Sequence, residues 1–170
     1  MGKVLAIANQ KGGVGKTTTS VNLAASLNVT RKNVLLIDLD PQGNATTGSG
    51  VDKSNLSLSV YDLLSESEKI ENVVLRPDAG YDLLPANGDL VAAEIDLMTG
   101  DGREVRLRSI TDSVRDTYDY IVVDCPPSLN MLTVNALVAA DGVVIPMQCE
   151  YYALEGLSAL MDNISAIRDR

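Results

Sequence analysis

A glycine-rich segment near the start of the chain carries residue types that bind phosphate groups. It reads Gly12-Gly13-Val14-Gly15-Lys16-Thr17-Thr18, after a short apolar run and before a helical pattern. Glycines let the backbone turn until several N–H groups point into one hollow, and the start of a helix adds its positive dipole. We expect Lys16 to contact the β- and γ-phosphates, Thr17 to bind Mg²⁺, and Thr18 to reach the α-phosphate. The segment therefore predicts a site for a nucleoside triphosphate and its magnesium ion.

The segment departs from the common phosphate-loop pattern at its first position. G-x-x-x-x-G-K-[ST] places a glycine where this chain has Gln10, and a second lysine, Lys11, stands five residues before Lys16. A dinucleotide-binding fingerprint is disfavoured, because Thr18 stands where it needs a glycine and no acidic residue stands at the expected ribose position. A glycine-rich turn without a ligand is the other alternative, and the Lys-Thr pair at the expected helix start argues against it.

Two carboxylates follow a second apolar run, in the sequence Asp38-Leu39-Asp40-Pro41-Gln42. The carboxyl ends of parallel strands face the ligand crevice of an α/β sheet, and strand alternation places Asp38 and Asp40 on the same side. Phosphoryl transfer depends mainly on positioning and charge neutralisation, so we expect one carboxylate to orient the attacking water and the other to help hold the metal's waters. A solvated strand end that caps a turn would explain the pair by itself. The phosphate loop upstream favours the catalytic interpretation.

A third carboxylate, Asp124, follows the apolar run Tyr120–Val123. This pattern is typical of a Walker B strand, whose Asp binds Mg²⁺ directly or through water. Asp-Cys-Pro-Pro then predicts a stiff loop that senses the γ-phosphate. A helix cap is the alternative role for Asp124. We expect Cys125 and Cys149 to be packing residues and not nucleophiles.

Short apolar runs alternate with helical patterns along the chain. The runs predict strands over Val4–Ala8, Val34–Leu39, Tyr81–Leu84, Tyr120–Val123 and Val143–Met147. The helical patterns cover Lys16–Asn28, Asp89–Met98, Arg103–Arg115, Leu129–Ala139 and Tyr152–Arg168. Residues 41–59 predict a mobile loop, and residues 72–84 predict a hairpin. The expected fold is α/β, a parallel sheet with helices on both faces, of the P-loop NTPase type, in a single domain spanning residues 1–170.

Composition excludes several function classes. The 170 residues include no His, which excludes His-based triads and His-ligated metal sites, and two Cys, which exclude a disulfide framework. No stretch approaches the roughly 20 apolar residues of a membrane span, so we expect a cytoplasmic protein without membrane contact. The net charge of −9 gives the whole chain no electrostatic footprint for nucleic acid, although residues 1–60 carry 6 basic and 3 acidic side chains.

The motifs together resemble one family. Lys11–Thr18 resembles the deviant Walker A motif of the ParA/MinD ATPases, and Asp38–Thr46, Leu83–Leu90 and Asp124–Ala140 are similar to ParA/Soj partitioning proteins. The resemblance implies ATP and Mg²⁺ as cofactors, an ATP-dependent homodimer in which Lys11 reaches the partner's nucleotide, and Asp40 as the water-positioning residue. It also implies chromosome or plasmid partitioning, DNA bound without sequence preference, and a ParB-type activator that stimulates hydrolysis.

Family members are longer, so we expect C-terminal strands and helices of the family, with their adenine contacts and DNA-holding basic residues, to be missing here. The resemblance also places the Pro146–Gly156 loop near the nucleotide and the dimer interface. Alternatives are a MinD-like positioning ATPase, although the final helix is not basic along one face, and a metabolic P-loop enzyme that phosphorylates a small carboxylate. An iron–sulfur carrier needs cysteines at a dimer axis, which the positions of Cys125 and Cys149 disfavour. A non-catalytic fragment is the fourth alternative.

Overall fold

The computed structural model describes residues 1–98, 102–149 and 153–168. Its five strands pair in parallel in the order β3-β2-β4-β1-β5, which confirms the predicted parallel sheet. The strands are β1 (Lys3–Ile7), β2 (Val34–Asp38), β3 (Asp82–Leu84), β4 (Tyr120–Asp124) and β5 (Gly142–Val144). The predicted strands match these bounds within a few residues.

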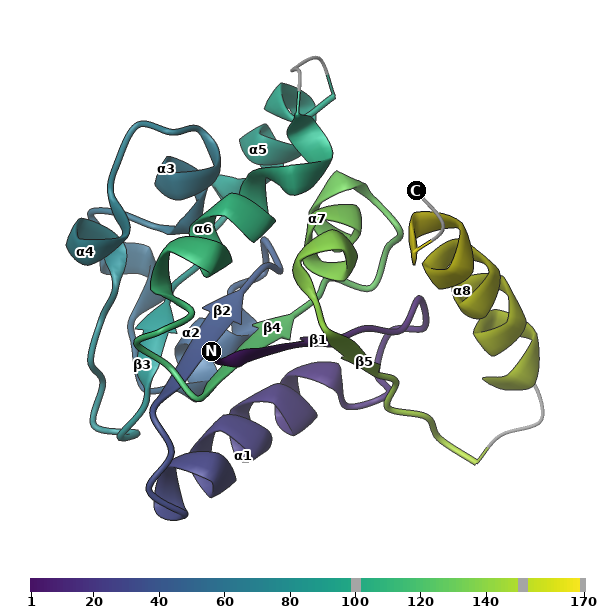
Figure 1. Cartoon of the computed structure of the whole chain (residues 1–170), viewed down its shortest axis with the longest axis horizontal. Helices are drawn as coiled ribbons and strands as arrows, with labels where there is room; N and C mark the ends of the chain where they lie inside the picture. The colour runs from purple at the N-terminus through teal and green to yellow at the C-terminus, as the bar shows by residue number, and fades with distance from the viewer. Residues whose placement is uncertain (99–101, 150–152, 169–170) are drawn as a thin grey trace.

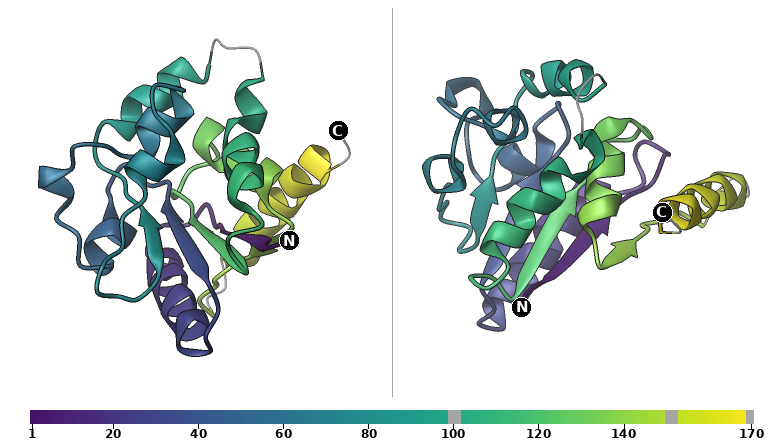
Figure 2. Two further views of the ribbon diagram at one scale, coloured as in Figure 1. Left: turned by 60° about the vertical axis from the view of Figure 1, so that its left-hand side comes forward. Right: turned by 45° about the horizontal axis from the view of Figure 1, so that its top comes forward.

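Helices cover both faces of the sheet, with α1 on one face and α6 and α7 on the other (Figure 1). The long α8 packs beside α7, near the edge of the sheet that is formed by β5 (Figure 2). The α-helices are α1 (Lys16–Val29), α2 (Asn44–Gly48), α3 (Val60–Leu64), α4 (Ile70–Val73), α5 (Leu90–Asp96), α6 (Arg106–Val114), α7 (Met131–Ala139) and α8 (Ala153–Arg168), with 3₁₀ turns η1 (Lys53–Asn55) and η2 (Arg103–Val105). No described helix is long and apolar enough to span a bilayer.

The sheet is buried on both sides, which explains why its strands read as continuous apolar runs. Every residue of β2 is buried. On the α1 face, Leu36 and Val122 pack with Ala24. On the opposite face, Leu35 and Ile121 belong to a second cluster, which also includes side chains of α3, α5, α6 and α7. Two apolar layers of this kind hold the strands in register, so the polar residues at the strand ends have fixed positions.

Three predicted elements differ from the observed ones. The prediction of a mobile loop over residues 41–59 was wrong in part, because Asn44–Gly48 forms α2 and Thr46 is fully buried. The predicted hairpin over residues 72–84 is reduced to one antiparallel bridge between Leu75 and Leu83, since Ile70–Val73 is helical. The predicted helix over Arg103–Arg115 begins as a 3₁₀ turn and becomes α-helical only at Arg106.

Candidate phosphate-binding site

The loop between β1 and α1 has the backbone shape of an anion-binding turn. Gly13 has φ 74° and Gly15 has φ 89°, in the left-handed region that favours glycine. A Cβ added at either position would meet no atom within 4 Å, so the requirement comes from the backbone conformation. Helix α1 begins directly after Gly15 without a side-chain cap. Its first N–H groups therefore remain available to a ligand at the end of a 14-residue helix dipole.

Lys16 lies at the base of this loop with its side chain turned inward. Only 7% of the residue is exposed, and Nζ donates a 2.9 Å hydrogen bond to the Lys11 carbonyl oxygen. Burial lowers the pKa of Lys16, while the charges of Asp124 and Asp40 act in the opposite direction. The ammonium group thus lies at the phosphate loop, close enough to Asp124 and Asp40 for their charges to affect its pKa. Its contact with the β- and γ-phosphates stays a prediction.

Asp124 joins the end of β4 to the first turns of α1. Its Oδ2 accepts a 2.8 Å hydrogen bond from Thr17 Oγ1, and its Oδ1 accepts one of 2.7 Å from Ser20 Oγ. The residue is fully buried, and burial raises the pKa of Asp124, against the lowering effect of both hydroxyls. The structure therefore brings together Thr17 and Asp124, two of the three residues predicted to hold the metal or its waters. Ser20 was missed, although its place three residues after Thr17 puts it on the same helix face.

Asp40 follows β2, and its charge acts on both Lys16 and Asp124. Its Oδ1 accepts a 2.9 Å hydrogen bond from the Gln42 N–H, which fixes the carboxylate on a tight turn. The residue is 8% exposed. This position, at the carboxyl end of the sheet near the lysine, is the one predicted for a water-positioning carboxylate.

Asp38 is fully buried at the end of β2, where it pairs in register with Asp124. Its Oδ2 accepts hydrogen bonds of 2.7 Å from both the N–H and the hydroxyl of Thr46, and its Oδ1 accepts one from the Asp40 N–H. Burial raises the pKa of Asp38 to about 7. These bonds occupy both carboxylate oxygens of Asp38 within the protein, which gives the residue a structural role. Its contact with the metal's waters stays a prediction.

Two residues support the loop from its far side, Asn9, which the sequence interpretation did not single out, and Gln148, which belongs to the predicted Pro146–Gly156 segment. Asn9 accepts a 3.0 Å hydrogen bond from the Lys11 N–H and donates one of 2.8 Å to the Pro146 carbonyl oxygen. Gln148 Nε2 donates a 3.2 Å hydrogen bond to the Gly13 carbonyl oxygen. The segment after β5 thus contacts the phosphate loop. Residues 150–152 of the predicted Pro146–Gly156 site segment lie outside the described residues.

The donor set suits a metal that is shared with phosphate oxygens. Among the described residues, no group of three or more His, Cys, Asp or Glu side chains forms a metal cage. Mg²⁺ commonly uses one or two protein oxygens and completes its shell with phosphates and water. Thr17 and Asp124 supply such oxygens. Cys125 is buried beside Asp124, where burial raises the pKa of its thiol, and Cys149 is exposed.

Comparison with known proteins agrees with this geometry. A family model described as an AAA domain matches residues 2–170. The sporulation initiation inhibitor protein Soj of Bacillus subtilis is 52% identical over 169 residues, which cover 99% of this chain and 67% of Soj. The chain belongs to this AAA-domain family, among its ParA/Soj-type members. As a ParA/Soj-type domain it also matches the structure of cobyrinic acid a,c-diamide synthase from Mycobacterium smegmatis, solved with an ATP analog and magnesium. That match has a TM-score of 0.96 and 42% identity, over 99% of this chain and 69% of that one.

The ParA/Soj-type domain described here is shorter than its relatives. An uncharacterized protein of Pseudomonas putida is 64% identical over 171 residues, and the chain spans 65% of that protein's length.

Proposed function

We propose that the chain binds ATP with Mg²⁺, hydrolyses it to ADP and phosphate, and acts as a nucleotide-dependent switch in chromosome or plasmid partitioning in the cytoplasm. The observation that carries the proposal is the convergence of Lys16, Thr17, Asp124 and Asp40 on an open glycine loop at the start of α1. In phosphoryl transfer such groups bind the phosphates, hold the metal ion and orient the attacking nucleophile.

In this proposal the N–H groups of the loop Gly12–Gly15 and the start of α1 bind the phosphate oxygens. Lys16 leaves the Lys11 carbonyl oxygen and contacts the β- and γ-phosphates, and the exposed Thr18 side chain lies on α1 at the α-phosphate end. Thr17 and Asp124 hold Mg²⁺, which neutralises charge that develops on the phosphates. Asp40 orients a water molecule for in-line attack on the γ-phosphate. Because its turn is fixed by the Gln42 N–H, this carboxylate is positioned before the reaction begins.

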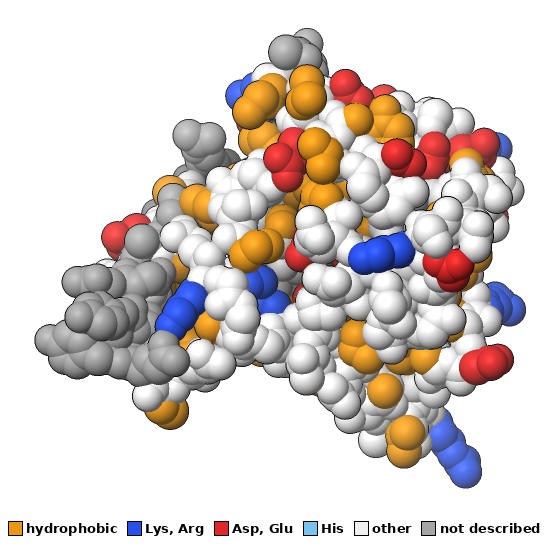
Figure 3. Space-filling model, turned by 180° about the vertical axis from the view of Figure 1, so that it is seen from behind, with side chains coloured by type: hydrophobic (Ala, Val, Ile, Leu, Met, Phe, Trp, Pro, Cys, Tyr) orange, Lys and Arg blue, Asp and Glu red, His pale blue; other side chains and the backbone are white. Residues whose placement is uncertain are grey.

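We also propose an ATP-dependent homodimer in which Lys11 contacts the partner's nucleotide. Lys11 lies on the exposed outer side of the phosphate loop. Large hydrophobic side chains are exposed on segments that follow the carboxyl ends of β3, β4 and β5. These residues are Val91, Ile95, Met98, Leu129 and Met147. Helix α5 lies at the upper end of the molecule (Figure 1), and hydrophobic side chains gather at that end of the space-filling view (Figure 3). An apolar surface beside a ligand site is typical of a protein–protein interface.

A ParB-type activator and DNA bound without sequence preference complete the proposed cycle. Support comes from the family, whose members include chromosome partitioning proteins named ParA, and not from the charge of the chain, which is −9 overall. A MinD-like positioning role uses the same switch and differs in the surface to which the dimer attaches. Filter binding of this chain to unrelated duplexes, with and without ATP, tests the DNA part separately from the ATPase part.

The structural match to cobyrinic acid a,c-diamide synthase favours one second candidate, a ligase that phosphorylates a small carboxylate. In such an enzyme the γ-phosphate goes to a carboxylate oxygen, and ADP release depends on that substrate. A switch ATPase instead transfers the phosphate to water and needs no small acceptor. ADP release measured with and without cobyrinic acid and an amide donor separates the two.

The test of the proposed function uses the wild type and Asp40→Ala with ATP, ADP and no nucleotide. Light scattering after size exclusion gives the mass, and phosphate release gives turnover. We expect a dimer only with ATP, more of it in Asp40→Ala, and phosphate release only from the wild type. A mass that is the same in all three nucleotide states would contradict the switch, and phosphate release that requires a carboxylate acceptor would favour the ligase.

A further inference from the structure

A chain of buried hydrogen bonds leads from the phosphate site to a loop on the far side of β2. Asp38 lies next to Asp124 in the sheet, and the Leu39 N–H donates a 2.9 Å hydrogen bond to the Asp124 carbonyl oxygen. On its other side, the Asp38 carboxylate is bound by the N–H and hydroxyl of Thr46, the third residue of α2. Both residues are fully buried, so these bonds are shielded from water.

The Thr46 hydroxyl group extends this series of hydrogen bonds, because it both donates and accepts one. While Oγ1 donates to Asp38 Oδ2, it accepts a 2.9 Å hydrogen bond from the Ala86 N–H. Ala86 belongs to the loop between β3 and α5, within the Leu83–Leu90 segment whose sequence has no assigned role. One hydroxyl group therefore connects β2, α2 and the β3–α5 loop. Without it the Ala86 N–H would lose this partner, and Asp38 Oδ2 would keep only the Thr46 N–H.

Gly43 brings the same two segments into direct backbone contact. It has φ 60°, and an ideal Cβ at this position would lie 2.6 Å from the Ala86 carbonyl oxygen. Because no side chain fits there, the turn Asp40–Gly43 rests against the Ala86 backbone. The Gly43 N–H closes that turn with a 2.8 Å hydrogen bond to the Asp40 carbonyl oxygen.

The turn that carries Asp40 is thus held from both of its ends. Asp38 Oδ1 accepts a 3.1 Å hydrogen bond from the Asp40 N–H at the start, and Thr46 anchors α2 to Asp38 and Ala86 at the end. Because these hydrogen bonds fix the Asp40 carboxylate before the reaction, little entropy is lost in the transition state. A residue that supports the turn can therefore raise the rate of hydrolysis.

We propose that Thr46 is a positioning residue for hydrolysis: its hydroxyl ties Asp38 to the Ala86 backbone and so holds the turn on which Asp40 orients the attacking water. This role rests on the proposed ATPase function, in which Asp40 is the water-positioning group. It assigns a task to the Leu83–Leu90 segment as the far support of that turn. It also predicts that Thr46 affects the chemical step and leaves nucleotide binding to the phosphate loop.

The test compares Thr46→Val, which removes the hydroxyl, with Thr46→Ser, which retains it. Thr47→Val is the matched control, because Thr47 is the exposed next residue of the same helix and its hydroxyl bonds locally, at 3.1 Å to the Gly43 carbonyl oxygen four residues earlier, and does not join Asp38 to Ala86. For each protein, kcat and KM come from phosphate release and the affinity for MgATP from calorimetry. We expect Thr46→Val to lose roughly 10- to 100-fold in kcat with ATP affinity unchanged, since misplacement of a reacting group by about 1 Å has effects of this size. Thr46→Ser and Thr47→Val should match the wild type.

The possible outcomes separate this role from the function on which it rests. Wild-type kcat in folded Thr46→Val, equal loss of kcat and ATP affinity, or no rescue by Thr46→Ser would each overturn the positioning role. A wild type that binds ATP and releases no phosphate would overturn the proposed hydrolysis itself, and this role with it. If a thermal unfolding scan shows that Thr46→Val does not fold, Thr46→Ala, which also lacks the hydroxyl, replaces it. The same changes in kcat and ATP affinity are then expected of Thr46→Ala.

Discussion

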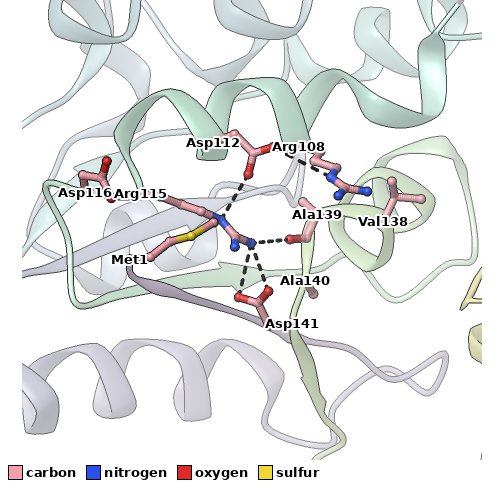
Figure 4. A pocket seen from close by; sticks show the side chains of 9 residues that line it. All are labelled: Met1, Arg108, Asp112, Arg115, Asp116, Val138, Ala139, Ala140 and Asp141. Atoms are coloured by element: carbon pink, nitrogen blue, oxygen red, sulfur yellow. Dashed lines mark hydrogen bonds and ion pairs between the residues drawn. The ribbon is translucent and has the colours of Figure 1, made fainter.

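The two ends of the sheet both carry buried or half-buried charges, and they use them differently. At the amino end, Arg115 of the segment after α6 lies in a cavity of about 310 Å³ (Figure 4). Its Nη2 donates to both oxygens of Asp141, at 3.1 and 3.2 Å, and to the Ala139 carbonyl oxygen. Its Nε lies 3.1 Å from Asp112 Oδ1, as an ion pair without the angle of a hydrogen bond. Asp141 in turn accepts a 2.8 Å hydrogen bond from the Val4 N–H.

At the carboxyl end, the charges face a loop of glycines instead of one another. Lys16 Nζ donates a hydrogen bond to the Lys11 carbonyl oxygen, and Asp124 and Asp40 are close enough to affect the pKa of Lys16. The loop next to it has room for added atoms at Gly13 and Gly15. A guanidinium that is matched to carboxylates within the chain stabilises the fold, while an ammonium held beside open backbone donors is suited to a ligand.

The largest expected effect is the loss of nucleotide binding in Lys16→Gln. The change removes the positive charge and keeps a polar hydrogen-bond donor on a side chain one atom shorter. Loss of about 3 kcal/mol of charge-assisted hydrogen bonding corresponds to roughly 100-fold weaker MgATP binding. Calorimetry checks the affinity, with the exposed Lys32→Gln as the control, which should bind as the wild type does. Equal affinities in the two variants would remove Lys16 from the site.

Asp40→Ala is expected to affect turnover and not binding. Removal of a positioned carboxylate lowers kcat by about 100-fold or more, while the phosphate loop keeps its contacts. Single-turnover phosphate release and calorimetry on the same preparation measure the two quantities. Asp78→Ala, an exposed site in the β-turn before β3, serves as the control. A variant that loses ATP affinity as well would contradict the role assigned to Asp40.

Much of this site was predictable because its residues lie at the ends of strands or at the start of a helix. Lys16, Thr17, Asp40 and Asp124 follow from local patterns plus the rule that parallel strands end at one edge. Thr46 did not follow, since its partners Asp38 and Ala86 are eight and 40 residues away. The same long-range contacts turn residues 44–48 into a helix, against a local composition of Gly, Ser, Thr and Asn that predicts a loop. Asn9 was missed for a similar reason, because its bond to Pro146 joins segments more than 130 residues apart. Gln148 belongs to the predicted Pro146–Gly156 segment, but its bond to the Gly13 carbonyl oxygen did not follow from local patterns.

Arg115→Ala should lower the stability of the fold and leave ATP binding unchanged, whereas Lys16→Gln should weaken ATP binding. Loss of the ion pairs and of the hydrogen bond to the Ala139 carbonyl oxygen is expected to lower the free energy of unfolding by about 1–2 kcal/mol. The affinity for MgATP should not change, since the cluster lies at the opposite end of the sheet. Urea denaturation provides the measurement, and Arg108→Ala, a more exposed arginine of the same cavity, is the control and should cost less. A change in ATP affinity would show that the two ends are coupled.

A further prediction concerns Asp38 and the pH dependence of stability. Burial raises its pKa to about 7, from 3.8, so the folded protein binds this proton more tightly than the unfolded chain does. The contribution of Asp38 to the free energy of unfolding therefore falls as pH rises from about 4 to about 7 and is constant outside that window. Urea denaturation of the wild type and Asp38→Asn across this range should show a difference that grows in favour of the variant as pH rises. A difference that is independent of pH would contradict the raised pKa.

Calorimetric titration of MgATP into the folded wild type, beside Lys16→Gln, tests the central claim most directly. We predict saturable binding of one nucleotide per chain in the wild type and its loss in the variant, because the loop donors and the ammonium group act together on the phosphates. No binding to the folded wild type, or equal binding to both proteins, would contradict a phosphate site at the carboxyl end of the sheet.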